Sequence, residues 1–555
     1  MPVTSYEPST DNETIILKVG EDAKFNQIYT TSGLGNTNNN PDDYQIWYRG
    51  IEIYGSNDLM SWTSLATLDN NDFYKWTVSE VETGYYPYIK IVFPSEHSIL
   101  TEIGVKMDDV DTFLPLSVYG QSHFDNAYPV YYLFDENDLI PTDITYQDET
   151  YFDEIYHARN ALEINQDQYL YAHVHPLLGT TLISLGISLF GINTFGFRFM
   201  GALFSVLLIP LFYLLIKKLW NNDYLSIVGT SLLAFDFMHY TTGRIATLEP
   251  FSIFFITAMY YFMICYVKED FYRYKNKKKY LYLSLSAIMM ACSWATKWTG
   301  LYASVGLALI FFIHLFKQYR RSFKSVNHKK IFTYQTIRLV AWNIIWFIII
   351  PVVFYFLIYT IPMIYRESYS GVWDFISKII DYTLGIFSYH SHLESTHPFE
   401  STWIQWLFNI RPIWYYFKSV EDGIYTISCF NNPLISWLGI ISMLYTIFHA
   451  IKKRTMASII IVMGYLSSLL PWIFIGRCLF SYHYYPSYPF LILSIVYFFN
   501  ELIKKDLRYK KIITGFCILC GILFILFLPV IGGFKTDMTY VNAFLRWFET
   551  WYFGH

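Results

Sequence analysis

Apolar and polar positions are unevenly distributed along this chain. Residues 1–170 are polar and acidic, whereas residues 199–533 form long apolar runs separated by basic clusters. A helix needs roughly 20 apolar residues to cross the hydrocarbon core of a bilayer. The pattern therefore predicts a polytopic α-helical protein of the cell membrane with about ten spans. The expected spans are 199–216, 224–243, 247–267, 280–296, 299–316, 339–362, 433–451, 456–475, 483–502 and 512–533.

The composition agrees with a place in the bilayer. Of the 555 residues, 54% are hydrophobic and 15% are charged, whereas a soluble protein carries about 25% charged residues. Buried helices of a large soluble domain are the alternative, but so many long apolar runs would need a core larger than this chain could cover. The net charge of −5 gives no support for nucleic-acid binding.

Lysine and arginine predict the orientation, because short cytoplasmic loops are enriched in both. With ten spans, five basic clusters that hold 23 of the 40 basic residues all fall on one side of the membrane. Residues 1–198, the loop 365–432 and the C-terminal tail 534–555 are then extracytoplasmic. Residues 1–30 contain no apolar h-region of a signal peptide, so we expect a further spanning helix before residue 1. The clusters are Lys217–Lys218, Lys268–Lys279, Lys317–Arg338, Lys452–Arg454 and Lys504–Lys511.

Residues 1–120 predict an extracytoplasmic β-sandwich. Three segments are rich in residues that favour strands, and two clusters of turn-forming residues break them. Together with Trp62 and Trp76, the pattern resembles a discoidin-type, galactose-binding-like jelly roll. Its aromatic side chains either stack on sugars or pack the core. The strand segments are Tyr44–Tyr54, Trp62–Leu68 and Tyr86–Phe93, and the turns are Gly33–Asp43 and Asp69–Asp72.

Residues 121–198 are expected to form an outer loop and a membrane-surface segment, ahead of the transmembrane domain at 199–533. This segment places the carboxylates Asp153 and Glu154 side by side, with His157 and Arg159 close by. Ionisable groups at a membrane are costly and are therefore candidates for function. Such a site suits a substrate with a polar head and a lipid tail, and a solvated loop with incidental charges is the alternative.

Histidines and cysteines give weaker signals. His390, His392 and His397 share one outer loop, and a His-x-His pair can bind a metal. No compact set of carboxylates accompanies them, so we expect loop packing or acceptor binding there and no metal. Cys517 and Cys520 form a CxxC pair inside an apolar span, where a packing role is expected.

Short motifs follow one another between residues 151 and 500: Phe152–Arg159, His175–Gly179, Gly196–Arg198, Phe235–His239, Arg244–Glu249, Ala295–Gly300, Thr396–Ser401, Arg411–Tyr416 and Pro471–Tyr484. In this order they resemble the motifs of the protein O-mannosyltransferases and their bacterial relatives in the glycosyltransferase C superfamily. Each motif is weak alone, whereas the ordered set is specific. The second motif of the family usually reads His-Pro-Pro-Leu-Gly-Lys, but Leu177 and Thr180 replace its second proline and its lysine, so a donor contact of that lysine cannot be carried over. Glu249 stands where the family usually has aspartate.

The resemblance implies an inverting enzyme that moves mannose from a polyprenyl or dolichyl monophosphate to Ser or Thr hydroxyls of exported proteins. A neutral hydroxyl is a poor nucleophile, so a carboxylate must accept its proton. Asp153 is our choice for this base, and Glu154 positions the acceptor or tunes Asp153. No cofactor is expected, because the lipid-linked sugar is a substrate.

Negative charge grows on the leaving phosphate, and fixed cations near the membrane surface would stabilise it. For each cation, the alternative role is an interfacial anchor that reaches the lipid headgroups. The candidates for donor phosphate binding are Arg198, Arg244, Lys297 and Arg477, and those for other substrate contacts are His157, Arg159, His175, His397 and His483.

Other functions remain as alternatives. Within the same enzyme class, the sugar could differ, or the acceptor could be a glycan or a lipid. A membrane transporter also has many spans with internal charges, but it predicts internal repeats and helices broken at mid-membrane, and no repeat is visible. A surface receptor would leave the Asp-Glu segment unexplained.

Overall fold

The computed structural model of this protein describes residues 1–33, 50–68, 73–122, 128–273, 276–363, 369–394 and 396–554. The chain divides into two compact units. The first contains Met1–Ala172 and Ile183–Phe197, and the second contains His173–Leu182 and Arg198–His555.

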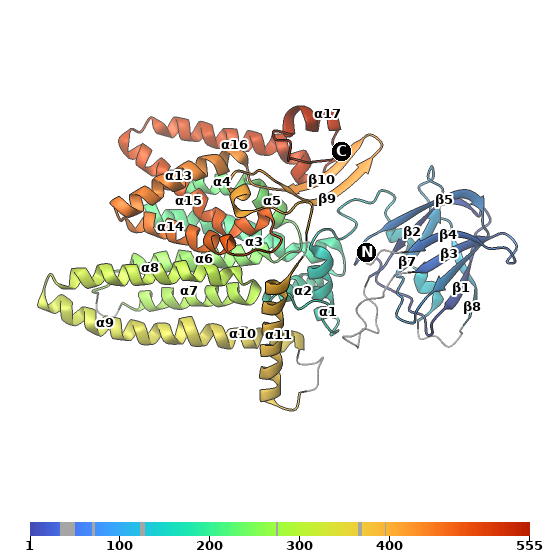
Figure 1. Cartoon of the computed structure of the whole chain (residues 1–555), viewed down its shortest axis with the longest axis horizontal. Coiled ribbons are helices and arrows are strands. Elements are labelled where there is room, and N and C mark those ends of the chain that lie inside the picture. The colour runs from blue at the N-terminus through green and yellow to red at the C-terminus, as the bar shows by residue number, and fades with distance from the viewer. Residues whose placement is uncertain are drawn as a thin grey trace. The chain divides into compact units, whose positions relative to one another are not determined.

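The first unit contains a β-sandwich of two antiparallel sheets (Figure 1). One sheet has the strand order β4-β3-β6-β1-β8, and the other has the order β5-β2-β7. Alternate residues of β1 and β6 are buried, and Ile15 pairs with Ile91 in register, so both strands turn the same face to one core. The strands are β1 (Glu13–Val19), β2 (Lys24–Thr31), β3 (Ile51–Ser56), β4 (Thr63–Leu68), β5 (Thr77–Tyr85), β6 (Tyr88–Phe93), β7 (Glu102–Lys106) and β8 (Leu116–Gln121).

The strand predictions are confirmed where they fall on described residues. The segments at 62–68 and 86–93 form β4 and β6, and the end of the segment at 44–54 forms β3. Residues 44–49, and the turns expected at 34–43 and 69–72, lie outside the described residues. Trp76 is buried in a small cluster with Tyr29 and Ile140, which supports a packing role for this side chain over sugar stacking.

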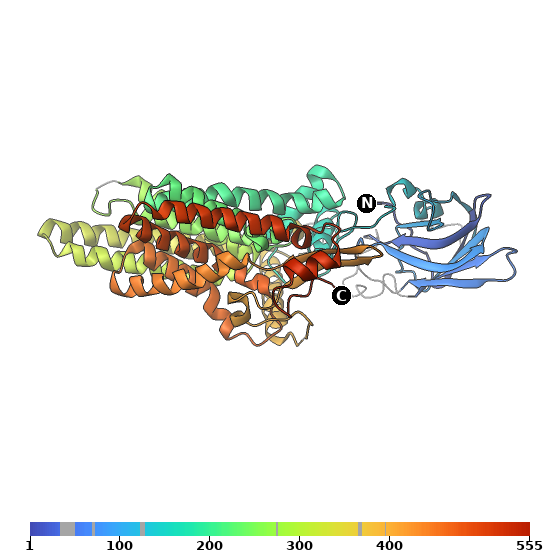
Figure 2. The same ribbon diagram turned by 90° about the horizontal axis from the view of Figure 1, so that it is seen from above.

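The second unit is a bundle in which long helices run side by side (Figures 1 and 2). Within the described part of the chain, eight helices are long and apolar enough to cross a membrane, and they coincide with eight of the ten expected spans. The α-helices of the described residues are α1 (Glu154–Asn165), α2 (Leu178–Phe190), α3 (Thr194–Trp220), α4 (Asp223–Ala234), α5 (Phe237–Gly243), α6 (Glu249–Val267), α7 (Lys277–Thr296), α8 (Thr299–Ser322), α9 (Val326–Ile344), α10 (Ile350–Met363), α11 (Val372–His392), α12 (Trp403–Leu407), α13 (Pro433–Lys452), α14 (Met456–Leu469), α15 (Tyr488–Lys505), α16 (Tyr509–Gly532) and α17 (Met538–Tyr540).

The two other expected spans differ from the prediction. The run at 224–243 is not one helix but the two short helices α4 and α5, because buried Asp236 interrupts it. The Asp236 carboxylate accepts the amide of His239 at 3.0 Å and so begins α5, and it also accepts the amide of Asn432 at 2.9 Å. The run at 280–296 is helical as α7, but α7 is not among the eight helices that are apolar enough to span.

The segments expected as an outer loop and tail contain structure that the sequence did not predict. Residues 365–432 include the amphipathic helix α11 and an antiparallel hairpin of β9 (Ile413–Val420) and β10 (Gly423–Cys429). In Figure 1, α11 runs across the direction of the long helices of the bundle. Thr536 of the tail pairs with Ile424 of the hairpin, and Trp551 is fully buried, so the tail packs onto this region.

Candidate active site

Asp153 and Glu154 lie at the start of α1 in the first unit. Glu154 is buried, and its Oε2 accepts the amide of Tyr151 at 3.2 Å. Asp153 is half-buried, and its carbonyl accepts the amide of His157 at 3.1 Å. Phe152, directly before it, has φ +53°, a left-handed conformation that non-glycine residues rarely adopt. Strained backbone of this kind gathers at functional sites, and here it sets the direction in which the chain enters α1 with both carboxylates.

Arg159 lies further along α1 and is buried in contacts within the same unit. Its Nε donates to Glu163 Oε1 at 3.0 Å, and its guanidinium lies 3.7 Å from the ring centre of Tyr171. Glu163 Oε2 in turn accepts the amide of Tyr171 at 2.7 Å. These contacts hold the segment after α1 against the helix. The substrate contact proposed for Arg159 stays a prediction beside these structural partners.

A charged pair joins two helices of the second unit. Lys297 follows the last residue of α7, and its ammonium donates to the carboxylate of Glu249, the first residue of α6, which is 48 positions earlier. Both side chains are largely buried, with 13% and 9% exposed, and Lys297 Nζ also lies 5.5 Å from the ring centre of Tyr482. A charge in such a place is costly unless it is paired, so Glu249 holds the ammonium in position.

Positive charge gathers around His390 of α11. Its Nε2 donates to the Val174 carbonyl at 2.8 Å, and its ring lies 5.1 Å from that of His175. Burial and the positive charge of Arg477 lower the pKa of His390 to about 4, with a smaller contribution from Lys297, while the Val174 carbonyl opposes them. Both cations therefore act on one neutral ring, and His175 lies beside it.

His483 lies between the residues around Lys297 and those around Arg477. It is buried, and together with Lys297 and Glu249 it lines a narrow pocket. The ring of Trp472 lies 4.6 Å from His483, and Trp472 also lines a polar pocket of about 720 Å³ together with Arg477. The Nε1 of Trp472 is buried and has no hydrogen-bond partner among the described residues. The polar pocket also contains Glu394, Glu400 and Arg411.

The other predicted residues have different neighbours. His397 is exposed, and its ring packs 5.1 Å from that of Phe480. Arg244 ends α5, where its Nη1 donates to the Tyr240 hydroxyl at 3.2 Å and to the Gly532 carbonyl at 2.8 Å. Arg198 is half-buried on α3. Of the four predicted phosphate ligands, Lys297 and Arg477 thus lie near the same two histidines, His390 and His483. Arg244 is instead bound to the end of α16.

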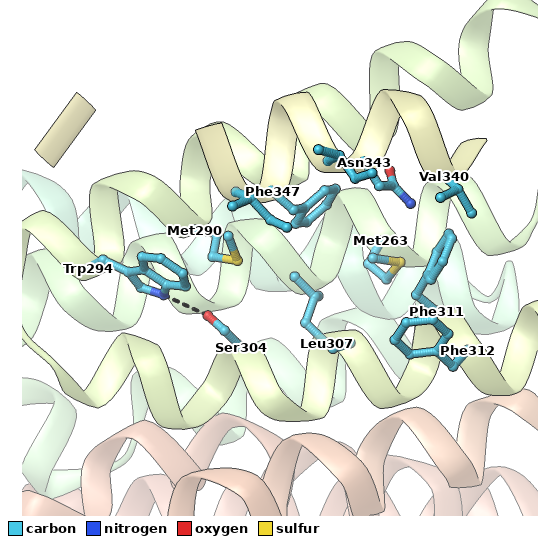
Figure 3. A pocket seen from close by; sticks show the side chains of 13 residues that line it. Met263, Met290, Trp294, Ser304, Leu307, Phe311, Phe312, Val340, Asn343 and Phe347 are labelled. Carbon is cyan, nitrogen blue, oxygen red and sulfur yellow. Dashed lines mark hydrogen bonds between the residues drawn. The ribbon is translucent and has the colours of Figure 1, made fainter. Parts of the chain in front are cut away.

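An apolar pocket of about 380 Å³ lies between helices of the second unit (Figure 3). Methionine, leucine and phenylalanine side chains from α6, α7 and α8, and from the π-helical turn that follows α9, point into it. At one end, Trp294 Nε1 donates to Ser304 Oγ at 2.8 Å. Trp294 lies one helical turn before Lys297, so the same helix carries the pocket wall and, at its end, the cation. The labelled wall includes Met263, Met290, Leu307, Phe311, Phe312 and Phe347.

Comparisons with known proteins agree with this architecture. The model of the dolichyl-phosphate-mannose-protein mannosyltransferase family matches residues 142–365, and the model of the C-terminal four-helix membrane region of protein O-mannosyltransferase matches residues 375–551. A polyprenol-phosphate-mannose–protein mannosyltransferase of Mycobacterium tuberculosis is 24% identical over 383 residues, which are 60% of this chain and 70% of the relative. The enzyme of that name from Corynebacterium glutamicum is 23% identical over 447 residues, or 68% and 81% of the two chains.

The bundle also matches a solved structure, the protein O-mannosyltransferase Pmt1-Pmt2 complex of S. cerevisiae bound to the sugar donor. The TM-score is 0.63 at 13% identity, over 73% of this chain and 89% of that chain. The bundle therefore has the fold of that complex, and the two matching family models place the chain among the integral-membrane glycosyltransferases. Within that class, this chain belongs to the protein O-mannosyltransferase family, as its ordered motifs indicated.

The sequence did not reveal several residues that lie around Lys297 and Arg477. Tyr482 and Trp472 lie inside matched motifs but were not assigned a role, and His390 was expected in loop packing or acceptor binding and not beside the two cations. The partnership of Glu249 with Lys297 has no local signal, because the two residues meet only when α6 packs against α7. The one hint of this pairing is that a lysine and a carboxylate lie in separate apolar segments of the sequence, where each needs a partner of opposite charge.

Proposed function

We propose that this chain moves mannose from a polyprenyl monophosphate onto Ser or Thr hydroxyls of exported proteins. The observation that carries the proposal is Lys297 at the end of α7, with the wall of an apolar pocket beginning one turn before it at Trp294. A fixed cation about one helical turn from the wall of an apolar pocket suits a donor with a phosphate head and an isoprenoid tail. The names of the mycobacterial and corynebacterial relatives point to the same donor.

The reaction follows from the groups present. The acceptor hydroxyl oxygen attacks the anomeric carbon of mannose, and the bond between that carbon and the phosphate oxygen breaks, so the anomeric configuration inverts. The hydroxyl proton passes to Asp153, and the bonding electron pair leaves with the phosphate. Positioned carboxylate bases contribute about 100- to 10,000-fold in rate. Glu154, buried beside Asp153, serves as the positioning residue.

Lys297 and Arg477 are the proposed partners of the leaving phosphate. The phosphate becomes a monoester and gains negative charge, which two fixed cations stabilise more in the transition state than in the bound donor. Glu249 keeps Lys297 ordered before the donor arrives, so little reorganisation is needed. No metal or other cofactor is part of this proposal. His175, His397 and His483 are proposed to contact the polar part of the substrates.

The proposal also includes an orientation. With the basic clusters in the cytoplasm, the N-terminal β-sandwich, the helix α11 and the end of α7 with Lys297 face the outside. Introduced cysteines in residues 50–120 and 380–392 should then react with an impermeant reagent in intact cells, while those in 317–330 should not. Reaction of the basic loops would contradict an outward-facing site.

The function itself is tested with purified protein, labelled polyprenyl-phosphate sugars and a panel of exported proteins. We expect transfer from the mannose donor to Ser or Thr, and no transfer to Ser/Thr-depleted versions of the same acceptors. Faster transfer from another sugar donor would replace the donor assignment, and transfer to a glycan or lipid would replace the acceptor.

A further inference from the structure

Three carboxylates meet at one point of the first unit, within the β-sandwich domain. Glu102 belongs to β7, and Asp135 and Glu136 follow the short 3-10 turn at Val130–Leu133. One oxygen from each side chain lies within 4.8 Å of the others. Glu102 is fully buried, whereas Glu136 is half-buried and Asp135 is exposed. An acidic group so far from water is unusual unless something compensates its charge.

The buried carboxylate of Glu102 is only partly satisfied. Its Oε2 has no hydrogen-bond partner among the described residues. Oε1 lies 2.7 Å from the side-chain amide of Asn137, which also lies 3.0 Å from the Ile103 carbonyl, and this amide donates to both only when its nitrogen faces them. In the opposite orientation, the amide adds a further oxygen to the group. Burial, and the negative charge of Asp135, raise the pKa of Glu102 to about 9.

Among the described residues, no lysine or arginine pairs with these three carboxylates to balance their negative charge. No ion pair among the described residues joins a lysine or arginine to Glu102, Asp135 or Glu136. The amino group of Met1 interacts electrostatically with Glu136, but burial lowers its pKa. It therefore offers at most one positive charge against three carboxylates.

We propose that Glu102, Asp135 and Glu136 form a Ca²⁺ site in the N-terminal domain. Calcium binds six to eight oxygen ligands at roughly 2.3–2.6 Å in irregular geometry, so two ligands of one ion lie at most about 5 Å apart. All three side chains offer oxygen, whereas zinc prefers nitrogen and sulfur, and magnesium demands a stricter octahedron. Oε2 of Glu102 supplies the buried ligand, and the Asn137 amide oxygen and the Ile103 carbonyl are close enough to add to the shell.

The ion would connect parts of the domain that are distant in sequence. Glu136 Oε2 already accepts the amides of Val3 at 2.6 Å and Thr4 at 3.0 Å, and the Thr4 hydroxyl donates to Asp135 at 2.8 Å. Glu102 lies on β7, in the three-stranded sheet. Bound calcium therefore fastens the N-terminal segment and the 130–136 segment to that sheet, and it stabilises the folded domain by mass action.

The test uses the full-length protein in detergent, freed of metal with a chelator and titrated with CaCl₂ in a calorimeter. We expect one site with a dissociation constant on the order of 10⁻⁴ M and a rise of roughly 4–8 °C in the unfolding temperature of the domain at saturation. A tenfold excess of MgCl₂ should not displace the ion.

Glu102→Gln and Asp135→Asn should each abolish binding, and Asp109→Asn, an exposed acid of the same domain, should keep it. In chelator, Glu102→Gln should be at least as stable as the parent, because it removes a buried carboxylate while keeping the shape. Because Asp135 is exposed, Asp135→Asn should fold normally, so a loss of calcium binding in this variant would come from the lost ligand. Equal titrations of the parent and Glu102→Gln, or no binding up to 5 mM calcium (about fifty times the expected constant), would overturn the proposal in favour of a protonated carboxyl group.

Discussion

Two sites with charged side chains, at the start of α1 and at the end of α7, are built in different ways. At the start of α1, two carboxylates stand next to each other, and the one at Glu154 is buried. At the end of α7, Lys297 is buried against the opposite charge of Glu249 from another helix. The first place combines two acidic side chains with a strained residue, Phe152, whereas the second joins opposite charges from two helices.

The difference suits the two places to the different roles proposed for them. Two acidic side chains at the start of one helix suit a site that must accept the proton of a hydroxyl group. A lysine paired with a buried carboxylate is held in place, which suits a group that must bind a phosphate. The comparison predicts that a change at Asp153 and a change at Lys297 will affect the transfer rate and the stability of the protein differently.

The largest effect is expected at Asp153. Asp153→Asn keeps the shape but removes the proton acceptor, so turnover should fall by about 100- to 10,000-fold, with little change in donor binding. Transfer rates and the affinity for the lipid-linked donor, measured on the same preparation, check this. Asp111→Asn, an exposed acid of the same unit, should behave as the parent. Near-normal transfer by Asp153→Asn in a stably folded protein would contradict the assignment of the base.

The second effect separates charge pairing from phosphate binding. Lys297→Met leaves Glu249 buried without its partner, and breaking such a pair costs about 3–5 kcal/mol of stability. The double variant Lys297→Met with Glu249→Gln should recover most of that stability, because no uncompensated charge remains. Its transfer rate should nevertheless stay down by about 100-fold. Recovery of both stability and transfer in the double variant would mean that the pair is purely structural.

The third prediction compares two arginines that the sequence could not distinguish. Arg477 lines the polar pocket, whereas Arg244 donates to the Gly532 carbonyl. Arg477→Gln should lower kcat/KM for the donor about tenfold, mainly through kcat, with an unchanged melting temperature, because a hydrogen bond to a charged group contributes about 1.5–3 kcal/mol. Arg244→Gln should lower the melting temperature and change kcat/KM little. The reverse outcome would move the phosphate to the Arg244 end of α5.

The same contrast explains how far the sequence alone could lead. The Asp-Glu segment is local, so Asp153 and Glu154 could be found as neighbours in one motif. Eight of the ten spans predicted from the long apolar runs coincide with helices long and apolar enough to cross a membrane, because hydrophobicity over 20 residues is a strong signal. The break at Asp236 was missed, since one carboxylate inside an apolar run reads as a tolerated residue until its partner Asn432 is known.

Tertiary contacts account for the other omissions. Glu249 and Lys297, or Trp472 and His483, meet only through helix packing, and no periodicity in the sequence encodes such pairs. The amphipathic helix α11 and the hairpin of β9 and β10 lay in a stretch assigned as a loop, because their apolar positions are fewer than those of a span. Among the acids of the N-terminal domain, Glu102 shows its burial only in the folded sheet.

The smallest predicted effect concerns the apolar pocket in Figure 3. Ala308 of α8 lines this pocket, and Ala308→Phe would fill part of its volume of about 380 Å³. If the pocket holds the isoprenoid tail, the KM for a long-chain donor should rise about threefold to tenfold, since each buried methylene group contributes about 0.8 kcal/mol. The KM for a short-chain donor analogue should change less, because its tail does not reach the added ring. Val305→Phe places the same ring on an exposed position of the same helix, outside the pocket lining, and should leave both values unchanged. Equal KM values for the long-chain and short-chain donors in Ala308→Phe would show that the tail lies elsewhere, while the assignments of Asp153 and Lys297 would still stand on their own tests.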